Sequence, residues 1–246
     1  ATLAGNQIII IGSLGYPDDR RPGRTQVLVL DLDKWSVSSA ATIGSPPGWI
    51  HKHTATLSAD GSSILIQRGL LDRGSRDRSL VENLDDWRLH LADWRWKRLT
   101  ERRWPRWEVR RKDGEMNHLF NYQQAAWAKQ FPELKSSSDE WNRIMKEADL
   151  PTLEEELGGS LDLELFARLY QPPVAFEALP KSEADDENNV RRIKVAGVVV
   201  RYVEDMTGIQ MTAEGALPQE TLEKLTRDLH DKFSKLENAP CELIQL

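Results

Sequence analysis

The sequence contains almost no cysteine, no long apolar run and no catalytic motif. Cys241 is the only cysteine among 246 residues, so neither an internal disulfide nor a cysteine-rich zinc site can form. One cysteine favours a reducing compartment, and we therefore expect a cytoplasmic protein. The longest apolar run, Ile8 to Ile11, is far shorter than the roughly 20 residues that cross a bilayer, so we expect no membrane partner.

Motifs for nucleophilic, phosphate-binding or dinucleotide chemistry are also missing. No serine stands in a glycine-flanked elbow, and no glycine-rich loop has the spacing that cradles a phosphate. The adjacent acids Glu154 to Glu156 have the pattern of a solvated helix face. We therefore expect a protein without a cofactor and without catalysis.

Charge is distributed unevenly along the chain, whose net charge is −6. Residues 1–67 hold five basic and five acidic residues, and residues 68–113 hold fourteen basic and nine acidic residues, a net charge of +5. Residues 114–246 hold fourteen basic and twenty-five acidic residues, a net charge of −11. The acidic C-terminal part favours a basic partner by electrostatic steering.

The first hundred residues contain an internal repeat. The phrase ATL at Ala1 returns at Ala55, and the apolar segment at Ile8 returns at Ile64. Turn-forming residues separate the two apolar segments in each copy, which predicts a β-hairpin. Further on, LDLDKW, ending at Trp35, matches LHLADW, ending at Trp94, and both alternate apolar and polar residues as strands do. A repeat of this length is typical of propellers and similar arrays.

The repeat resembles the Kelch family. The residues that carry the resemblance in the second copy are His53-Thr54-Ala55, Ile64 to Ile66 with Gly69, Asn83 with Asp85-Asp86-Trp87, and Trp94 or Trp96. In the first copy they are Ile8 to Gly12, Val27 to Leu32 and Trp35. The resemblance implies about two degenerate β-propeller blades, fewer than the ~4–8 of a closed ring. We therefore expect either a longer polypeptide, of which this chain is the C-terminal part, or another chain that completes the sheet.

The sequence after Gly114 changes to helical periods and then to a mixed segment. Residues 136–151 read as a capped helix that ends before Pro151, and residues 160–170 read as a short helix. Residues 191–205 and 209–215 are predicted strands, residues 216–237 a helix, and residues 241–246 a last strand, a ββαβ unit. We thus expect an α+β fold: a Kelch-like antiparallel β-repeat domain at 1–113, a partial propeller, and an acidic α+β domain at 114–246, mainly helical at first, with an exposed loop at 181–189.

The first functional hypothesis is a protein-binding module. Tryptophan and arginine alternate between residues 87 and 112, and both residue types are enriched at interaction hot spots. The predicted anchors are Trp104, Arg106 and Trp107, and the predicted steering patch is Asp185, Asp186 and Glu187. One concrete form of this hypothesis is a bacterial immunity protein that neutralises a basic toxin.

Two other classes stay open as alternatives. A hydrolytic or metal-dependent enzyme would have its site between the two domains, with His51, His53 and Asp60 as the candidates, although no third metal ligand stands near the histidines in the sequence. A nucleic-acid-associated factor would use the Trp/Arg-rich stretch 87–112. The acidic C-terminal part would repel a polyanion, which makes nucleic acid the weaker alternative.

Overall fold

The chain divides into two compact units. The structure is a computed structural model that describes residues 1–246 apart from 17–18, 73, 75–79, 131–149 and 181–189. The N-terminal unit is Ala1–Arg103 and the C-terminal unit is Trp104–Leu246. The sequence placed the boundary after residue 113, but residues 106–111 form a strand inside the C-terminal sheet, which moves the division toward the N-terminus.

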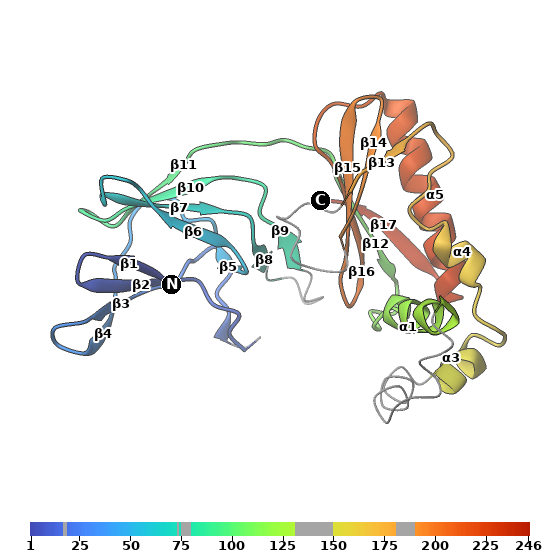
Figure 1. Ribbon diagram of the computed structural model, residues 1–246, viewed down its shortest axis with the longest axis horizontal. Helices are drawn as coiled ribbons and strands as arrows, with labels where there is room; N and C mark the ends of the chain where they lie inside the picture. Colours follow the sequence, from blue (N-terminus) through green and yellow to red (C-terminus); the bar gives the residue numbers. More distant parts are fainter. Residues whose placement is uncertain (17–18, 73, 75–79, 131–149, 181–189) are drawn as a thin grey trace. The chain divides into compact units, whose positions relative to one another are not determined.

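The described part of the N-terminal unit contains three antiparallel sheets (Figure 1). The first repeat sheet contains, as neighbours in this order, β1 (Thr2–Ala4), β2 (Gln7–Ile11), β3 (Val27–Asp31) and β4 (Ser36–Ser39). The second repeat sheet contains, as neighbours in this order, β6 (Thr54–Leu57), β7 (Ser63–Gln67), β10 (Trp87–His90) and β11 (Arg95–Arg98). A three-stranded sheet contains β5 (Trp49–His51), β8 (Leu70–Asp72) and β9 (Leu80–Glu82).

The two repeat sheets have the same strand order and the same register, which confirms the duplication predicted from the sequence. Equivalent cross-strand pairs are Leu3–Ile8 and Leu57–Ile64, Ile8–Leu30 and Ile64–Leu89, and Leu30–Val37 and Leu89–Trp96. Trp35 and Trp94 stand at equivalent turns, and both adopt a left-handed backbone with φ of 50° and 53°. Such a backbone is uncommon for a bulky residue, so its repetition shows that the turn geometry is duplicated as well.

The core of the N-terminal unit lies between the two repeat sheets. Side chains from one face of each repeat sheet form a single buried cluster with Ile50 of β5; the residues of the repeat sheets are Ile9, Ile11, Val27, Ile64, Ile66, Trp87, Leu89 and Trp96. Alternate residues along a strand point to opposite faces, so the period-two pattern of the sequence sends these residues to the same interior. The unit has no α-helix among its described residues, and the sheets therefore cover each other.

The Asn-Asp-Trp motif that contributed to the Kelch resemblance has a structural role. The side-chain nitrogen of Asn83 donates to the carbonyl oxygens of Arg68 at 2.9 Å and of Asp85 at 2.8 Å. Its side-chain oxygen accepts a hydrogen bond from the indole nitrogen of Trp87 at 3.2 Å. Asn83 thus fixes the entry to β10 and the orientation of a core tryptophan.

Within its described residues, the C-terminal unit contains one six-stranded antiparallel sheet and four helices. The strands are, in order across the sheet, β13 (Glu177–Ala178), β14 (Val190–Val195), β15 (Val198–Glu204), β16 (Gly208–Ala213), β12 (Arg106–Arg111) and β17 (Cys241–Gln245). The described helices are α1 (Leu119–Gln130), α3 (Leu150–Glu156), α4 (Leu163–Ala167) and α5 (Gln219–Glu237). No described helix has the length and apolarity that a membrane crossing requires.

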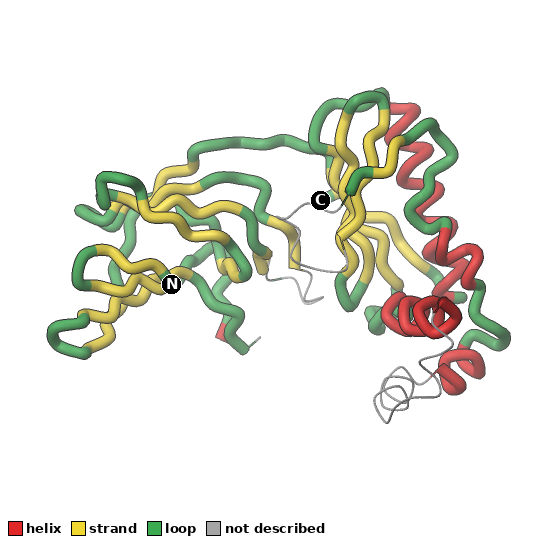
Figure 2. The backbone as a smooth tube through the Cα atoms, viewed as in Figure 1, coloured by secondary structure: helices red, strands yellow, loops and turns green. Residues whose placement is uncertain are grey.

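The long helix α5 lies along the sheet (Figure 2). Its buried face contains the apolar residues Leu222, Leu225, Leu229, Phe233 and Leu236. Pro218 precedes the helix, where its missing N–H costs nothing, and Asn238 ends it with a left-handed φ of 44°. The predicted helix over 216–237 is therefore confirmed, with its first turn at Gln219.

Two details of the C-terminal unit differ from the prediction. Residues 191–205 form a hairpin of β14 and β15 and not one strand, because Ala196 and Gly197 both have positive φ, as a two-residue hairpin turn requires. The ββαβ unit is thus βββαβ.

Helix α3 includes Pro151, which lies in its first turn and not past the end of a helix. Most of the helix predicted over 136–151, and the loop predicted at 181–189, fall outside the described residues.

Candidate functional site

The candidate metal ligands of the N-terminal unit lie in structural positions. His51 ends β5 and is buried, and burial lowers the pKa of the His53 imidazole to about 4. A Cβ atom on Gly69 would lie 2.6 Å from the His51 carbonyl oxygen and 2.7 Å from the Cβ of His53, so this segment packs directly on the glycine backbone. Among the described residues no group of three or more His, Cys, Asp or Glu could hold a metal ion.

Asp60, the third candidate of the enzyme hypothesis, is a turn residue. Its carboxylate accepts hydrogen bonds from the Ser58 hydroxyl at 2.6 Å and from the Ser62 amide and hydroxyl at 3.0 and 2.8 Å. These donors lower the pKa of the carboxyl to about 2. Asp60 therefore closes the hairpin between β6 and β7, a role that the turn sequence explains without catalysis.

Many tryptophans and arginines of the stretch 87–112 make contacts within the protein. Trp87 and Trp96 are buried in the N-terminal core, and the Arg98 guanidinium lies over the Trp87 ring at 5.6 Å from its centroid. Arginines of this stretch form ion pairs with carboxylates: Arg95–Asp93, Arg98–Asp85, Arg102–Asp86, Arg103–Glu101, Arg110–Glu242 and Arg111–Asp113. A guanidinium that is already paired has less charge to offer a phosphate, which weighs against the nucleic-acid alternative.

The predicted partner-binding residues are distributed between described and undescribed parts of the chain. Trp104 and Arg106 are half-buried at the start of the C-terminal unit. Trp107, opposite Met211 in the sheet, packs against the C-terminal core, so its ring is at least partly structural. Asp185, Asp186 and Glu187 fall outside the described residues, and their role in steering a partner stays a prediction.

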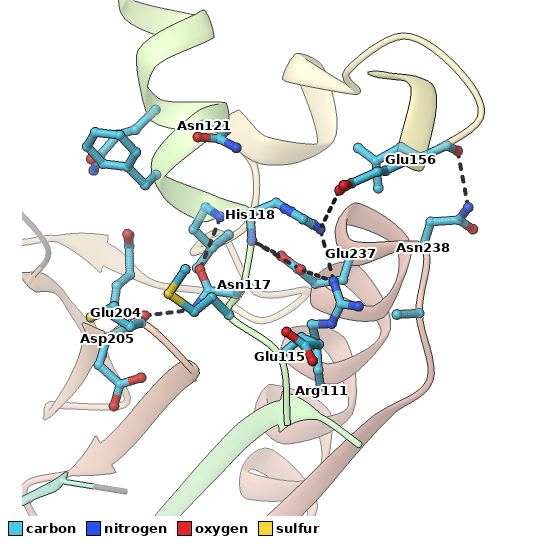
Figure 3. A pocket seen from close by; sticks show the side chains of 17 residues that line it. Arg111, Glu115, Asn117, His118, Asn121, Glu156, Glu204, Asp205, Glu237 and Asn238 are labelled. Carbon is cyan, nitrogen blue, oxygen red and sulfur yellow. Dashed lines mark hydrogen bonds and ion pairs between the residues drawn. The ribbon is translucent and has the colours of Figure 1, made fainter. Parts of the chain in front are cut away.

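A cavity in the C-terminal unit forms the candidate site (Figure 3). Its volume is about 950 Å³, and it lies where the C-terminal end of α5, the start of α1 and the β15–β16 turn come together. Five acidic side chains and one arginine line it: Glu115, Glu156, Glu204, Asp205, Glu237 and Arg111. The cavity is therefore strongly acidic.

Arg111 and Glu237 form the buried centre of this cavity. The Glu237 side chain has 0 % exposure, and its carboxylate accepts the backbone N–H of His118 at 3.0 Å and faces the Arg111 guanidinium at 3.5 Å. Burial raises the pKa of the Glu237 carboxyl to about 7, against the opposing effects of the His118 amide and Arg111. The Asp113 carboxylate forms an ion pair with the same guanidinium, at 2.6 Å between Oδ2 and the Arg111 Nη2 atom. The network ties the end of α5 to β12 and to the start of α1.

His118 completes this network as a neutral side chain. Burial and the nearby Arg111 both lower the pKa of its imidazole. The Arg111 guanidinium lies 2.9 Å from the Nε2 atom of His118, and because a guanidinium can only donate, Nε2 accepts and the ring proton lies on Nδ1. The exposed Glu156 lies 4.0 Å from the same ring. Protonation of His118 would therefore exchange a contact with Arg111 for an ion pair with Glu156.

A second buried carboxyl, Glu204, lies at the end of β15. It accepts a hydrogen bond from the Tyr170 hydroxyl at 2.6 Å, and burial raises the pKa of both groups. Next to it, the side-chain nitrogen of Asn117 donates to the Asp205 carbonyl at 2.7 Å, while the Asn117 side-chain oxygen accepts from the Leu119 amide at the start of α1. The wall of the cavity is thus held by hydrogen bonds between distant segments.

Three large apolar side chains at the cavity are exposed. Met116, Phe120 and Met206 all line it and are each more than half exposed. Exposed apolar groups beside a polar hollow are typical of a binding site for another molecule. Glu115 and Glu156 are exposed as well and belong to the same lining. The accessible part of the site therefore combines negative charge with apolar surface.

Burial raises the pKa of two further reactive groups of the C-terminal unit, the carboxyl of Glu237 and the thiol of Cys241. Glu237 binds a proton near neutral pH, but its fully enclosed side chain cannot touch a substrate. Cys241 is buried, and burial raises the pKa of its thiol, so it is a poor nucleophile. The exposed side chains of the cavity are therefore carboxylates and flexible apolar groups.

The sequence did not point to Arg111, His118 and Glu237 as one group. One signal was available: Glu237 is an acid in the last turn of a helix, where the helix dipole disfavours negative charge. That position marks an acid held by something outside the helix.

Comparisons with known proteins add no family to this description. A scan against protein-family models gives no match for this chain, and a search of curated proteins finds none that matches it.

Proposed function

We propose that this chain is a protein-binding module and that the cavity of the C-terminal unit receives a basic segment of its partner. The observation that carries this proposal is the combination of the exposed carboxylates of Glu115 and Glu156 with exposed Met116, Phe120 and Met206 at the same cavity. The one lining arginine, Arg111, is already held by Asp113 and Glu237, so it does not cancel the attraction for a cation.

The net charge of the C-terminal part supports the same conclusion. With −11 over residues 114–246, this part attracts a basic partner and speeds the encounter. A lysine or arginine side chain could place its charge near Glu115 and Glu156 and lay its apolar stem on the methionines. A bacterial immunity protein that neutralises a basic toxin is the concrete form of this proposal, and it rests on charge alone.

For the N-terminal unit we propose a Kelch-like partial propeller. Two four-stranded meanders with the same register, each with a tryptophan in a left-handed turn after its third strand, support this reading. Scaffolds of this kind present loops for recognition, which agrees with a binding protein.

Site-specific photo-crosslinking tests the proposed site. A photoreactive phenylalanine analogue replaces Phe120 at the cavity or, as a matched control in the same unit, Phe176, which is also exposed. In cells that express the natural partner, we expect position 120 to capture a basic protein and position 176 to capture none.

Charge reversal then tests whether the acidic side chains of the cavity are required for capture of the partner at position 120. Glu115→Lys with Glu156→Lys should abolish the crosslink from position 120, because both exposed carboxylates would then repel a cation. Equal capture from positions 120 and 176, capture of an acidic protein, or a crosslink that survives the charge reversal would contradict the proposal.

A further inference from the structure

Each repeat sheet has a back face, formed by six equivalent side chains that lie opposite one another across the strands. In the first repeat sheet the back face is Leu3, Ile8, Ile10, Leu28, Leu30 and Val37. In the second repeat sheet it is Leu57, Ile64, Ile66, Trp87, Leu89 and Trp96. All twelve side chains are apolar, and directly opposite residues share a face of the sheet. Both copies therefore present an apolar back face.

The back face of the second repeat sheet is covered by the first repeat sheet. The opposite, front face of the first sheet carries Ile9, Ile11 and Val27, which belong to the same buried cluster as Ile64 and Leu89. The repeat thus packs front face on back face, as stacked repeats do.

The edge of the second repeat sheet is covered as well. Ile43, in the segment that follows β4, forms a parallel bridge with Arg95 at the outer edge of β11. Its amide donates to the Trp94 carbonyl at 3.0 Å, and its carbonyl accepts from the Trp96 amide at 2.8 Å. Gly44 lies so close that a Cβ atom would stand 2.7 Å from the Trp96 carbonyl oxygen. An apolar residue followed by glycine is therefore the fitting occupant of this edge.

The same two surfaces of the first repeat sheet are less covered: two of its six back-face side chains, Leu3 and Val37, are exposed, and the other four are half-buried. Val37 is 62 % exposed and Leu3 is 60 % exposed, whereas Trp96, the equivalent of Val37, is 4 % exposed. Strand β4 is the outermost strand of its sheet within the described residues, and all four of its residues are exposed. It contains neither charge nor proline, the usual protections of an exposed edge. Exposed apolar side chains beside an unprotected strand edge are typical of a surface that another β-structure covers.

The front face of the second repeat sheet shows the opposite pattern. Where the first copy has Ile9, Ile11, Val27 and Val29, the second copy has Leu65, Gln67, Asp86 and Arg88 at the equivalent positions, so three of these four apolar positions become polar or charged. A polar outer face is typical of the terminal repeat of a stack, which needs no further neighbour. The stack therefore ends at the second sheet and is open only at the first.

We propose that the back face of the first repeat sheet, together with the edge of β4, is the docking site for a further copy of this β-repeat. The occupant would present an apolar front face like that of Ile9, Ile11 and Val27. It would also supply a segment like Ile43–Gly44, whose apolar residue bridges to Ser36, the equivalent of Arg95. Head-to-tail association of two identical chains does not satisfy this site, because the free front face of the second sheet is polar.

An extended chain tests this proposal by disulfide trapping. Residues 1–54 are placed once more ahead of Ala1, so that the added copy joins Ala1 as Thr54 joins Ala55. Ile43→Cys in the added copy is combined with Ser36→Cys in the original copy, and disulfide formation is measured under mild oxidation on a non-reducing gel. The positive control is Ile43→Cys with Arg95→Cys in the unextended chain, whose backbones already form the bridge.

We expect the extended chain to form this disulfide as efficiently as the positive control, and roughly tenfold more than an off-register variant with Ser39→Cys, because sulfurs bridge only over a short Cα separation. The extended chain without cysteine substitutions should also show a higher midpoint of thermal unfolding. A working positive control without the Ser36 disulfide overturns the proposal. So does a disulfide between two unextended chains that carry Ser36→Cys alone, because β4 would then pair with a second copy of this chain.

Discussion

The two units of this protein cover their sheets in different ways. In the C-terminal unit the helix α5 packs on the six-stranded sheet, and its apolar face supplies a large part of the core. In the N-terminal unit the described residues contain no α-helix, and one repeat sheet covers the other. The comparison teaches that a sheet with its own helix completes its core locally, whereas a pair of stacked sheets leaves an outer apolar face on which Leu3 and Val37 are exposed.

The strongest test of the helix-covered core is Phe233→Ala in α5. Phe233 is fully buried, so the truncation should cost about 4 kcal/mol in the free energy of unfolding. Urea unfolding followed by ellipticity at 222 nm reports the C-terminal unit, which contains the described helices. Phe120→Ala is the matched control, since this exposed side chain should cost less than about 0.5 kcal/mol. Equal losses would contradict the assignment of the core.

The sheet-covered core is tested by the same substitution at equivalent positions of the two copies. Leu89→Ala, in the covered back face, should destabilise the N-terminal unit by about 3 kcal/mol. Leu30→Ala, in the open back face, should cost about 1 kcal/mol, since a half-buried side chain loses less contact. Urea unfolding followed by tryptophan fluorescence measures the loss in the free energy of unfolding for each variant. A Leu30→Ala variant as unstable as Leu89→Ala would mean that the first back face is already covered in solution.

The buried carboxyl of the C-terminal unit predicts a pH dependence of stability. Because the folded pKa of Glu237 is raised from 4.5 to about 7, the folded state keeps a proton that the unfolded chain releases, and stability falls as pH rises through this window. The full effect is roughly 3 kcal/mol. Glu237→Gln should flatten this part of the pH profile of urea unfolding. Glu156→Gln, at an exposed glutamate of the same cavity, should leave the slope unchanged.

The smallest expected effect concerns the ion pairs of the N-terminal unit. Asp85 is buried and accepts hydrogen bonds from the Arg98 guanidinium, the Thr100 hydroxyl and the Arg102 amide. Asp85→Ala leaves these donors unsatisfied and should cost about 2 kcal/mol. Glu101→Ala breaks an exposed pair with Arg103 and should cost less than about 0.5 kcal/mol. Thermal unfolding compares the two, and a Glu101→Ala loss equal to that of Asp85→Ala would show that burial does not set the cost.

Much of the fold could be predicted from local pattern. The duplication, the strands at Ile8 and Ile64 and the helix that contains Phe233 follow from apolar spacing, which acts through neighbours in the chain. The hairpin at Ala196 was missed, because the segment is rich in β-branched residues on both sides of a turn that contains no Asn-Gly or Asp-Gly signal. The ion pairs of the arginines in residues 87–112 could not be predicted, since their carboxylate partners cannot be identified from spacing alone.

By itself, the sequence determined where apolar residues alternate, and therefore that the N-terminal part contains two equivalent sheets and the C-terminal part an amphipathic helix over strands. Only the tertiary structure decided that Arg111, His118 and Glu237 meet beside a cavity, and that one of two similar apolar faces is covered while the other stays open. The physical reason is the distance along the chain over which each property is determined. Periodicity is set between neighbours in the chain, whereas burial and ion pairing depend on which distant segments come into contact.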